Sequence, residues 1–175
     1  MLRFQKISVF AAMFMLGAGS CLAQQAPTIL KGSQNIHNIA KTYILKSAEL
    51  MPEENYSFQP TPDVRRFGDI LGHVADAQYL FCSAVLGEKN PEPGVEKSWK
   101  SKAGVIESLK SAFAYCEKAY AESPDGSRAV KLFGMDLTVV NALDFNIAHN
   151  FEHYGNMATY MRLKGLVPAS SLPKK

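Results

Sequence analysis

The chain has 175 residues, of which 47% are hydrophobic and 20% charged, a balance typical of one globular domain and not of a disordered or fibrous protein. Its formal net charge is +3, but two basic residues, Arg3 and Lys6, lie in the first 23 residues, which contain no acidic residue, so the remainder carries +1. A nearly neutral domain without a run of Lys or Arg offers no electrostatic basis for nucleic-acid binding. We therefore expect a small-molecule substrate.

The N-terminal segment has the pattern of a secretory signal peptide. Its two basic residues precede an apolar run over residues 7–16, and small residues follow. This predicts a signal peptide over residues 1–23, cleaved after Ala23, with export to the periplasm or the medium and a linker over residues 24–32. Two alternatives stay open: lipidation of Cys21, and retention of the segment as an anchor, for which the apolar run is short.

Apolar residues at helical spacing predict four helices in the rest of the chain. They cover residues 33–51, 66–86, 101–122 and 137–164. Clusters of proline, glycine and small polar residues separate them. No segment alternates apolar and polar residues over a length that would form a sheet, and no internal repeat is present. The sequence therefore predicts an all-α fold, a four-helix bundle over residues 33–168, followed by a C-terminal tail over residues 169–175.

Two cysteines, Cys82 and Cys116, fall on the apolar sides of the second and third predicted helices. In an exported protein the oxidising compartment permits a disulfide between them. The alternative is two buried thiols on neighbouring helices, because the sequence does not give the Cα separation that a disulfide requires.

Three of the four histidines are placed so that they can converge. His149 and His153 are four residues apart on the fourth predicted helix, which brings both imidazoles to one face. His73 lies on the inward stripe of the second helix, and bundle cores are where facing helices assemble metal sites. We predict that these three bind a divalent transition metal, and imidazole ligands suit zinc, nickel, iron or copper. The alternatives are a hydrogen-bonded core histidine at His73 and a solvated pair on the fourth helix; His37 is expected to be a packed or surface histidine.

Polar residues flank the three histidines on both helices. A metal-bound imidazole usually donates its second N–H to a carboxylate, carbonyl or amide. The candidates for this role are Asp69, Asp76, Asn146, Glu152 and Asn156. Asp76 and Glu152 are also candidate proton acceptors of a catalytic site. Residues 149–153 match the H-x-x-E-H pattern of inverted zinc peptidases as well, but those enzymes need an acidic ligand downstream, and no Asp or Glu follows His153.

Three segments carry a resemblance to a known family. They are Pro52-Glu53-Glu54-Asn55-Tyr56-Ser57-Phe58-Gln59-Pro60, Arg66-Phe67-Gly68-Asp69-Ile70-Leu71-Gly72-His73-Val74-Ala75-Asp76 and His149-Asn150-Phe151-Glu152-His153-Tyr154-Gly155-Asn156. With them the chain resembles the DinB-like (YfiT-like) family of metal-dependent hydrolases. The resemblance implies an up-down-down-up bundle and a metal bound by one histidine of the second helix and an H-x-x-x-H pair of the fourth, positions that His73, His149 and His153 fill. Arg66 departs from the small hydroxyl residue that relatives often have there.

Three functions stay open on these residues. Three protein ligands leave a coordination position for water or substrate, as in catalytic sites, which predicts a metal-dependent hydrolase. The resemblance, which extends to thiol transferases, implies a metal-dependent thiol S-transferase as an alternative. The third is a metal-binding sensor or partner-binding bundle without catalysis, in which apolar side chains would close the site. The sequence leaves the oligomeric state open, a homodimer included.

Overall fold

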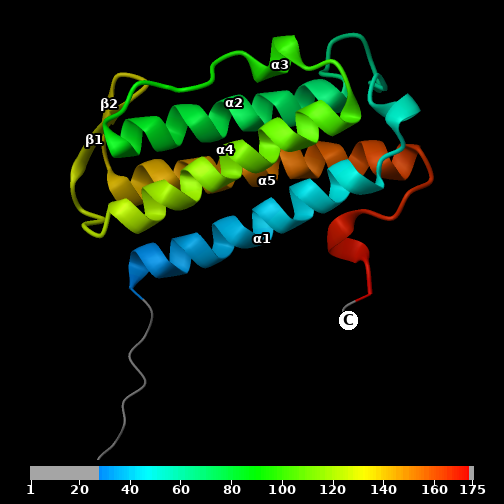
Figure 1. Cartoon of the computed structure of the whole chain (residues 1–175). Coiled ribbons are helices and arrows are strands. Elements are labelled where there is room, and N and C mark those ends of the chain that lie inside the picture. Colours follow the sequence, from blue (N-terminus) through cyan, green and yellow to red (C-terminus); the bar gives the residue numbers. More distant parts are fainter. Residues whose placement is uncertain (1–27, 174–175) are drawn as a thin grey trace, which may run out of the picture.

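The computed structural model describes residues 28–173. Its long helices are α1 (Ile29–Leu50), α2 (Phe67–Leu86), α4 (Lys102–Glu122) and α5 (Val139–Leu163), and they pack as the predicted four-helix bundle (Figure 1). The predicted signal peptide, with Cys21, lies outside the described residues. Among the helices of residues 28–173, none is long and apolar enough to cross a membrane.

Side-chain caps set the starts of three helices. Thr28, Ser101 and Thr138 each accept a hydrogen bond from the backbone N–H three residues later, at 3.2, 3.1 and 3.2 Å. The cap at Thr28 starts α1 before residue 33, where the predicted helix begins, so that part of the predicted linker is helical. Gly87 ends α2 in the left-handed conformation, with φ at 71°, which glycine adopts readily.

The helices run up, down, down and up. α2 and α4 lie side by side and parallel, because the connection between them returns along the length of the bundle (Figure 1). α1 packs against α5 and α4, while α5 also packs against α2. This order places α2 and α5, the two helices that carry the three histidines, against each other.

The connections contain short elements that the sequence did not predict. α3 (Val95–Ser98) lies against α2, and an antiparallel hairpin of β1 (Ala129–Leu132) and β2 (Met135–Thr138) precedes α5. The expectation of a fold without any sheet is therefore corrected. Each strand has only four residues, too few for a period of two to stand out against a helical pattern.

Two short 3-10 helices follow the first and the last of the long helices. The 3-10 helix η1 (Glu53–Asn55) follows α1, and η2 (Ala169–Ser171) follows α5 and contacts α1. Ala169 is buried, and the backbone N–H of Ser170 donates to the Tyr154 hydroxyl at 2.7 Å. The predicted C-terminal tail thus begins as part of the packed fold.

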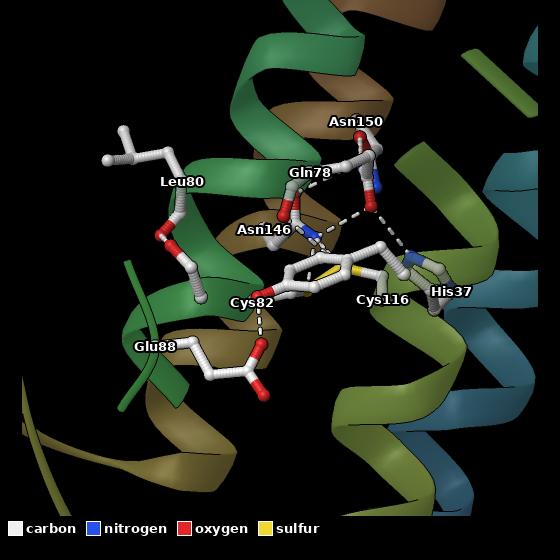
Figure 2. The surroundings of a disulfide bond; sticks show 10 residues. His37, Gln78, Leu80, Cys82, Glu88, Cys116, Asn146 and Asn150 are labelled. Atoms are coloured by element: carbon white, nitrogen blue, oxygen red, sulfur yellow. Dashed lines mark hydrogen bonds between the residues drawn. A yellow bond between two sulfur atoms is a disulfide. The ribbon is translucent and has the colours of Figure 1, made fainter. Parts of the chain in front are cut away.

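A disulfide joins α2 to α4. Cys82 and Cys116 are fully buried, their Cα atoms lie 5.2 Å apart, and Figure 2 shows the bond. The separation is within the usual range for a disulfide. Of the two alternatives left open by the sequence, the structure has the disulfide and not the free thiols.

Candidate metal centre

Three imidazoles from α2 and α5 converge between the two helices. Nε2 of His149 lies 3.1 Å from Nε2 of His73 and 3.0 Å from Nε2 of His153. His149 and His153 occupy successive turns of α5, and His73 faces them from α2. One nitrogen of each ring lies within 4.8 Å of the others. The predicted convergence of the three histidines is confirmed.

This donor set fits a first-row divalent ion. Imidazole nitrogens are common ligands of such ions. Ligand atoms 2.0–2.1 Å from a tetrahedral ion are about 3.3 Å apart, close to the 3.0 and 3.1 Å between the Nε2 atoms here. Two of the three pairs of donor atoms thus already have nearly the spacing of ligands around a single ion, and the third pair lies within 4.8 Å.

Glu96, on α3, orients His73. Its Oε2 lies 2.9 Å from Nδ1 of His73, and its Oε1 accepts a hydrogen bond from Nε of Arg65 at 2.8 Å. A carboxylate at Nδ1 keeps that nitrogen protonated and leaves the Nε2 lone pair for an ion. The sequence predicted neighbours of the histidines on α2 and α5 for this role, and it missed Glu96. No local signal marks Glu96, because its contact depends on the path of a connection.

Two residues of α2 fix that path. Gly72 lets the backbone of α3 approach closely, since a Cβ at this position would lie 2.5 Å from the Cα of Glu96. One turn further on, the Asp76 carboxylate accepts hydrogen bonds from the backbone N–H groups of residues 94–96, at 2.8, 2.7 and 2.9 Å. Asp76 therefore anchors α3, and its oxygens are occupied by backbone donors.

The other flanking residues have different surroundings. Asp69 pairs with Arg66 at 2.7 Å and accepts a hydrogen bond from the indole N–H of Trp99 at 3.0 Å. Glu152 and Asn156 are exposed and line a polar cavity. Glu152 is thus the predicted proton acceptor whose carboxylate faces an accessible space.

A buried hydrogen-bond network lies beside the histidine pair. The amide oxygen of Gln78 is 3.0 Å from Nε2 of His37 and accepts from Asn146 at 3.0 Å, while the amide nitrogen of Gln78 donates to Asn150 at 2.6 Å (Figure 2). All four side chains are buried. The two asparagines flank His149 on α5, so the network fixes the turn that carries it, and His37 is a packed core histidine.

Burial lowers the pKa of both histidines of α5. The pKa of His149 falls to about 4 and that of His153 to about 3, first because burial penalises the charged ring and then because the neighbouring imidazoles and Arg65 repel it. Both rings are therefore neutral at pH 7, the form that binds a metal. Within residues 28–173 their buried Nδ1 atoms have no polar partner, so only His73 has a protein group that selects its tautomer.

Two cavities reach the cluster. A polar one of about 570 Å³ is lined by Asp63, Arg65, Glu96, Glu152, His153 and Asn156, among others. An apolar one of about 490 Å³ is lined by His73, Leu80, Phe81, Phe133, Phe145 and His149, among others. The three histidines thus divide between the linings of the two cavities.

The chain matches the model of the DinB superfamily over residues 39–157. A DinB-like protein of Bacillus cereus has a similar structure, with a TM-score of 0.71 and 17% identity over 83% of this chain and 97% of the other. A second DinB-like protein, from Bacillus subtilis, has a TM-score of 0.56 and 20% identity over 85% of this chain and 96% of its own. No curated protein shows a significant match. The family match covers more than half of the sequence, and the helices pack as in these solved structures, so the chain belongs to the DinB superfamily.

Proposed function

We propose that the protein is an exported, metal-dependent hydrolase of a small molecule, in which His73, His149 and His153 hold a zinc, nickel or iron ion. The observation that carries this proposal is the convergence of the Nε2 atoms of three histidines whose side chains line two cavities. Three protein ligands leave a position for water or substrate, which is typical of catalytic metal sites. An ion in such a site lowers the pKa of its water and polarises the substrate.

The surrounding residues supply orientation and a proton acceptor. Glu96 holds His73 with Nε2 directed at the other two histidines, and Arg65 holds Glu96 in turn. Glu152 and His153 line the same polar cavity, which suits Glu152 for accepting a proton from an attacking water. Asp76, the other predicted acceptor, binds three backbone N–H groups, so we assign it to positioning.

Two further observations support parts of this proposal. The disulfide between Cys82 and Cys116 favours export, because such bonds persist in oxidising compartments and are rare in the cytosol. The two cavities favour an enzyme over a closed metal-binding module, because a substrate needs a path to the ion.

The test is turnover of a panel of neutral esters and amides by the purified protein, loaded with each metal in turn or stripped by a chelator. We expect hydrolysis that requires the metal and that His149→Ala abolishes. Glu152→Gln should retain the metal and lower kcat by about 100-fold, the usual contribution of general base catalysis. If turnover requires an added thiol, the assigned activity would be thiol transfer and not hydrolysis. Metal binding without turnover by either route would favour the non-catalytic alternative.

A further inference from the structure

Three phenylalanine rings from separate elements form an aromatic cluster beside the histidines. Phe81 of α2 packs edge to face on Phe133 of the β1–β2 turn and on Phe145 of α5, with ring centroids 5.7 and 5.2 Å apart, and the last two rings are 5.9 Å from each other. Phe133 is 58% exposed and Phe145 42%. Large exposed apolar groups that gather in one place are typical of a binding surface.

The backbone at the tip of the hairpin is in the left-handed region at Phe133. Phe133 has a φ of 51°, and it is the only residue other than glycine with a positive φ among those that the structure describes. A bulky side chain is rare in this left-handed region, and strain of this kind is concentrated at functional sites. The turn thus holds the phenyl ring of Phe133 against Phe81 of α2 and Phe145 of α5.

The three rings line the apolar cavity, which also contains His73 and His149. Its volume of about 490 Å³ is in the range of small-molecule sites. The ring of Phe81 lies 5.9 Å from that of His149. Among the described residues that line it, Asp76 is the sole acidic or basic side chain besides the histidines, and its oxygens bind three backbone N–H groups. The cavity therefore offers a ligand apolar and aromatic contacts and no free charge.

We propose that this cavity binds the neutral aromatic group of a substrate whose reacting bond lies at the histidines, with Phe133 as a specificity-determining residue. The placement of the reacting bond at the histidines rests on the proposed function, whereas the binding of an aromatic group in this cavity goes beyond it. Ring edges and faces contributed by three elements suit an aryl group, because such a group gains from offset and edge-to-face contacts in addition to its apolar area.

The first experiment tests the cavity without any metal. N-phenyl-1-naphthylamine, a neutral dye that brightens in apolar surroundings, is titrated into metal-free wild-type protein and the variants Phe133→Ala and Met135→Ala. Met135 is the control because it is 42% exposed on the same hairpin and lies outside the lining of the cavity. We expect saturable binding that Phe133→Ala weakens about tenfold, as the loss of one aromatic ring in contact with the dye predicts, and that Met135→Ala leaves unchanged. Equal binding by all three proteins, or association of the protein with itself in place of dye binding, would overturn the proposal.

The second experiment tests the link to the histidines. The zinc-loaded protein is titrated with acetohydroxamate and phenylacetohydroxamate, which share a metal-binding group and differ by the phenyl ring. We expect the phenyl compound to bind about tenfold more tightly and to displace the dye, with this gain lost in Phe133→Ala. Equal affinity of the two compounds would overturn the link. Failure of the protein to bind zinc, nickel or iron would overturn the proposed function and the placement of the reacting bond, while the dye titration would still decide the aromatic site.

Discussion

The carboxylate of Glu96 lies 2.9 Å from Nδ1 of His73, although 23 residues separate the two along the chain. Because α3 carries Glu96 and Asp76 anchors α3, the orientation of the α2 histidine depends on a connection and not on its own helix alone. The candidate metal centre therefore extends beyond the three ligands to the residues that hold this connection in place.

Removal of the Glu96 carboxylate should weaken metal binding. We expect Glu96→Ala to lower the affinity for zinc by about 10- to 100-fold, the usual effect of losing a partner of a metal-bound histidine. Glu96→Gln should lower it less, because the amide oxygen can still accept from Nδ1. Competition with a chromogenic chelator measures both variants. The control is Glu92→Gln, because Glu92 is an exposed residue of the same connection. If Glu96→Ala kept the wild-type affinity for zinc, the role of Glu96 in orienting His73 would be contradicted.

Gly72→Ala should displace α3 from α2. Its Cβ would lie 2.5 Å from the backbone of Glu96, so we expect a loss of about 1–3 kcal/mol in the free energy of unfolding, as for overpacking elsewhere, and a weaker metal affinity. Gly155→Ala is the matched control, since Gly155 is also helical and a Cβ there meets nothing within 4 Å. It should gain about 0.5–1 kcal/mol from helix propensity. Urea unfolding measures both, and equal effects of the two substitutions would contradict the close approach at Gly72.

The sequence predicted the features that depend on local periodicity. The four helices follow from apolar residues at helical spacing, and the convergence of the three histidines follows from His149 and His153 on one face and His73 on an inward stripe. The position of Glu96 could not be predicted, because it depends on contacts of Gly72 and Asp76 with a distant segment.

The aromatic cavity escaped prediction for a similar reason. It needs the turn at Phe133, and a strand of four residues on either side carries too little pattern to reveal a hairpin. The left-handed backbone of Phe133 is itself unexpected from its residue type. Local sequence thus predicted the helices of the bundle but not the loops that complete the site.

Reduction of the disulfide should destabilise the fold and leave the metal centre in place. Cys82 and Cys116 are 34 residues apart in sequence, and closing a loop of this length is worth about 4 kcal/mol in the chain-entropy account. We expect a reductant to lower the free energy of unfolding of the wild type by a value of this order. The double variant Cys82→Ala/Cys116→Ala should have the lower stability already and should not respond to reductant. Unchanged urea unfolding of the wild type after reduction would contradict this role of the bond.

The metal-free protein should lose stability in mild acid. Burial lowers the folded-state pKa of His37, and it lowers the pKa of His149 to about 4 and of His153 to about 3, whereas an unfolded histidine titrates near 6.5. Below pH ~6.5 the unfolded chain binds protons that the folded chain does not, so the free energy of unfolding falls as the pH drops toward 4.

Urea unfolding at pH 7.5 and pH 5.0 in the presence of a chelator measures this effect. His37→Gln should show a shallower dependence on pH than the wild type, because one of the three depressed groups is gone. If the free energy of unfolding of the wild type at pH 5.0 equalled or exceeded that at pH 7.5, the direction of these pKa shifts would be contradicted.

The central claim is that His73, His149 and His153 together hold one metal ion, and the most direct test is metal content per chain after loading with zinc, nickel or iron in turn and removal of loosely bound ions. We predict one ion per chain for the wild type and for His37→Gln, whose substituted residue lies in the buried network and not in the cluster. His149→Ala should retain its helical circular dichroism and hold no tightly bound ion, because only two ligands remain. Full occupancy in His149→Ala, or none in the wild type, would contradict the account.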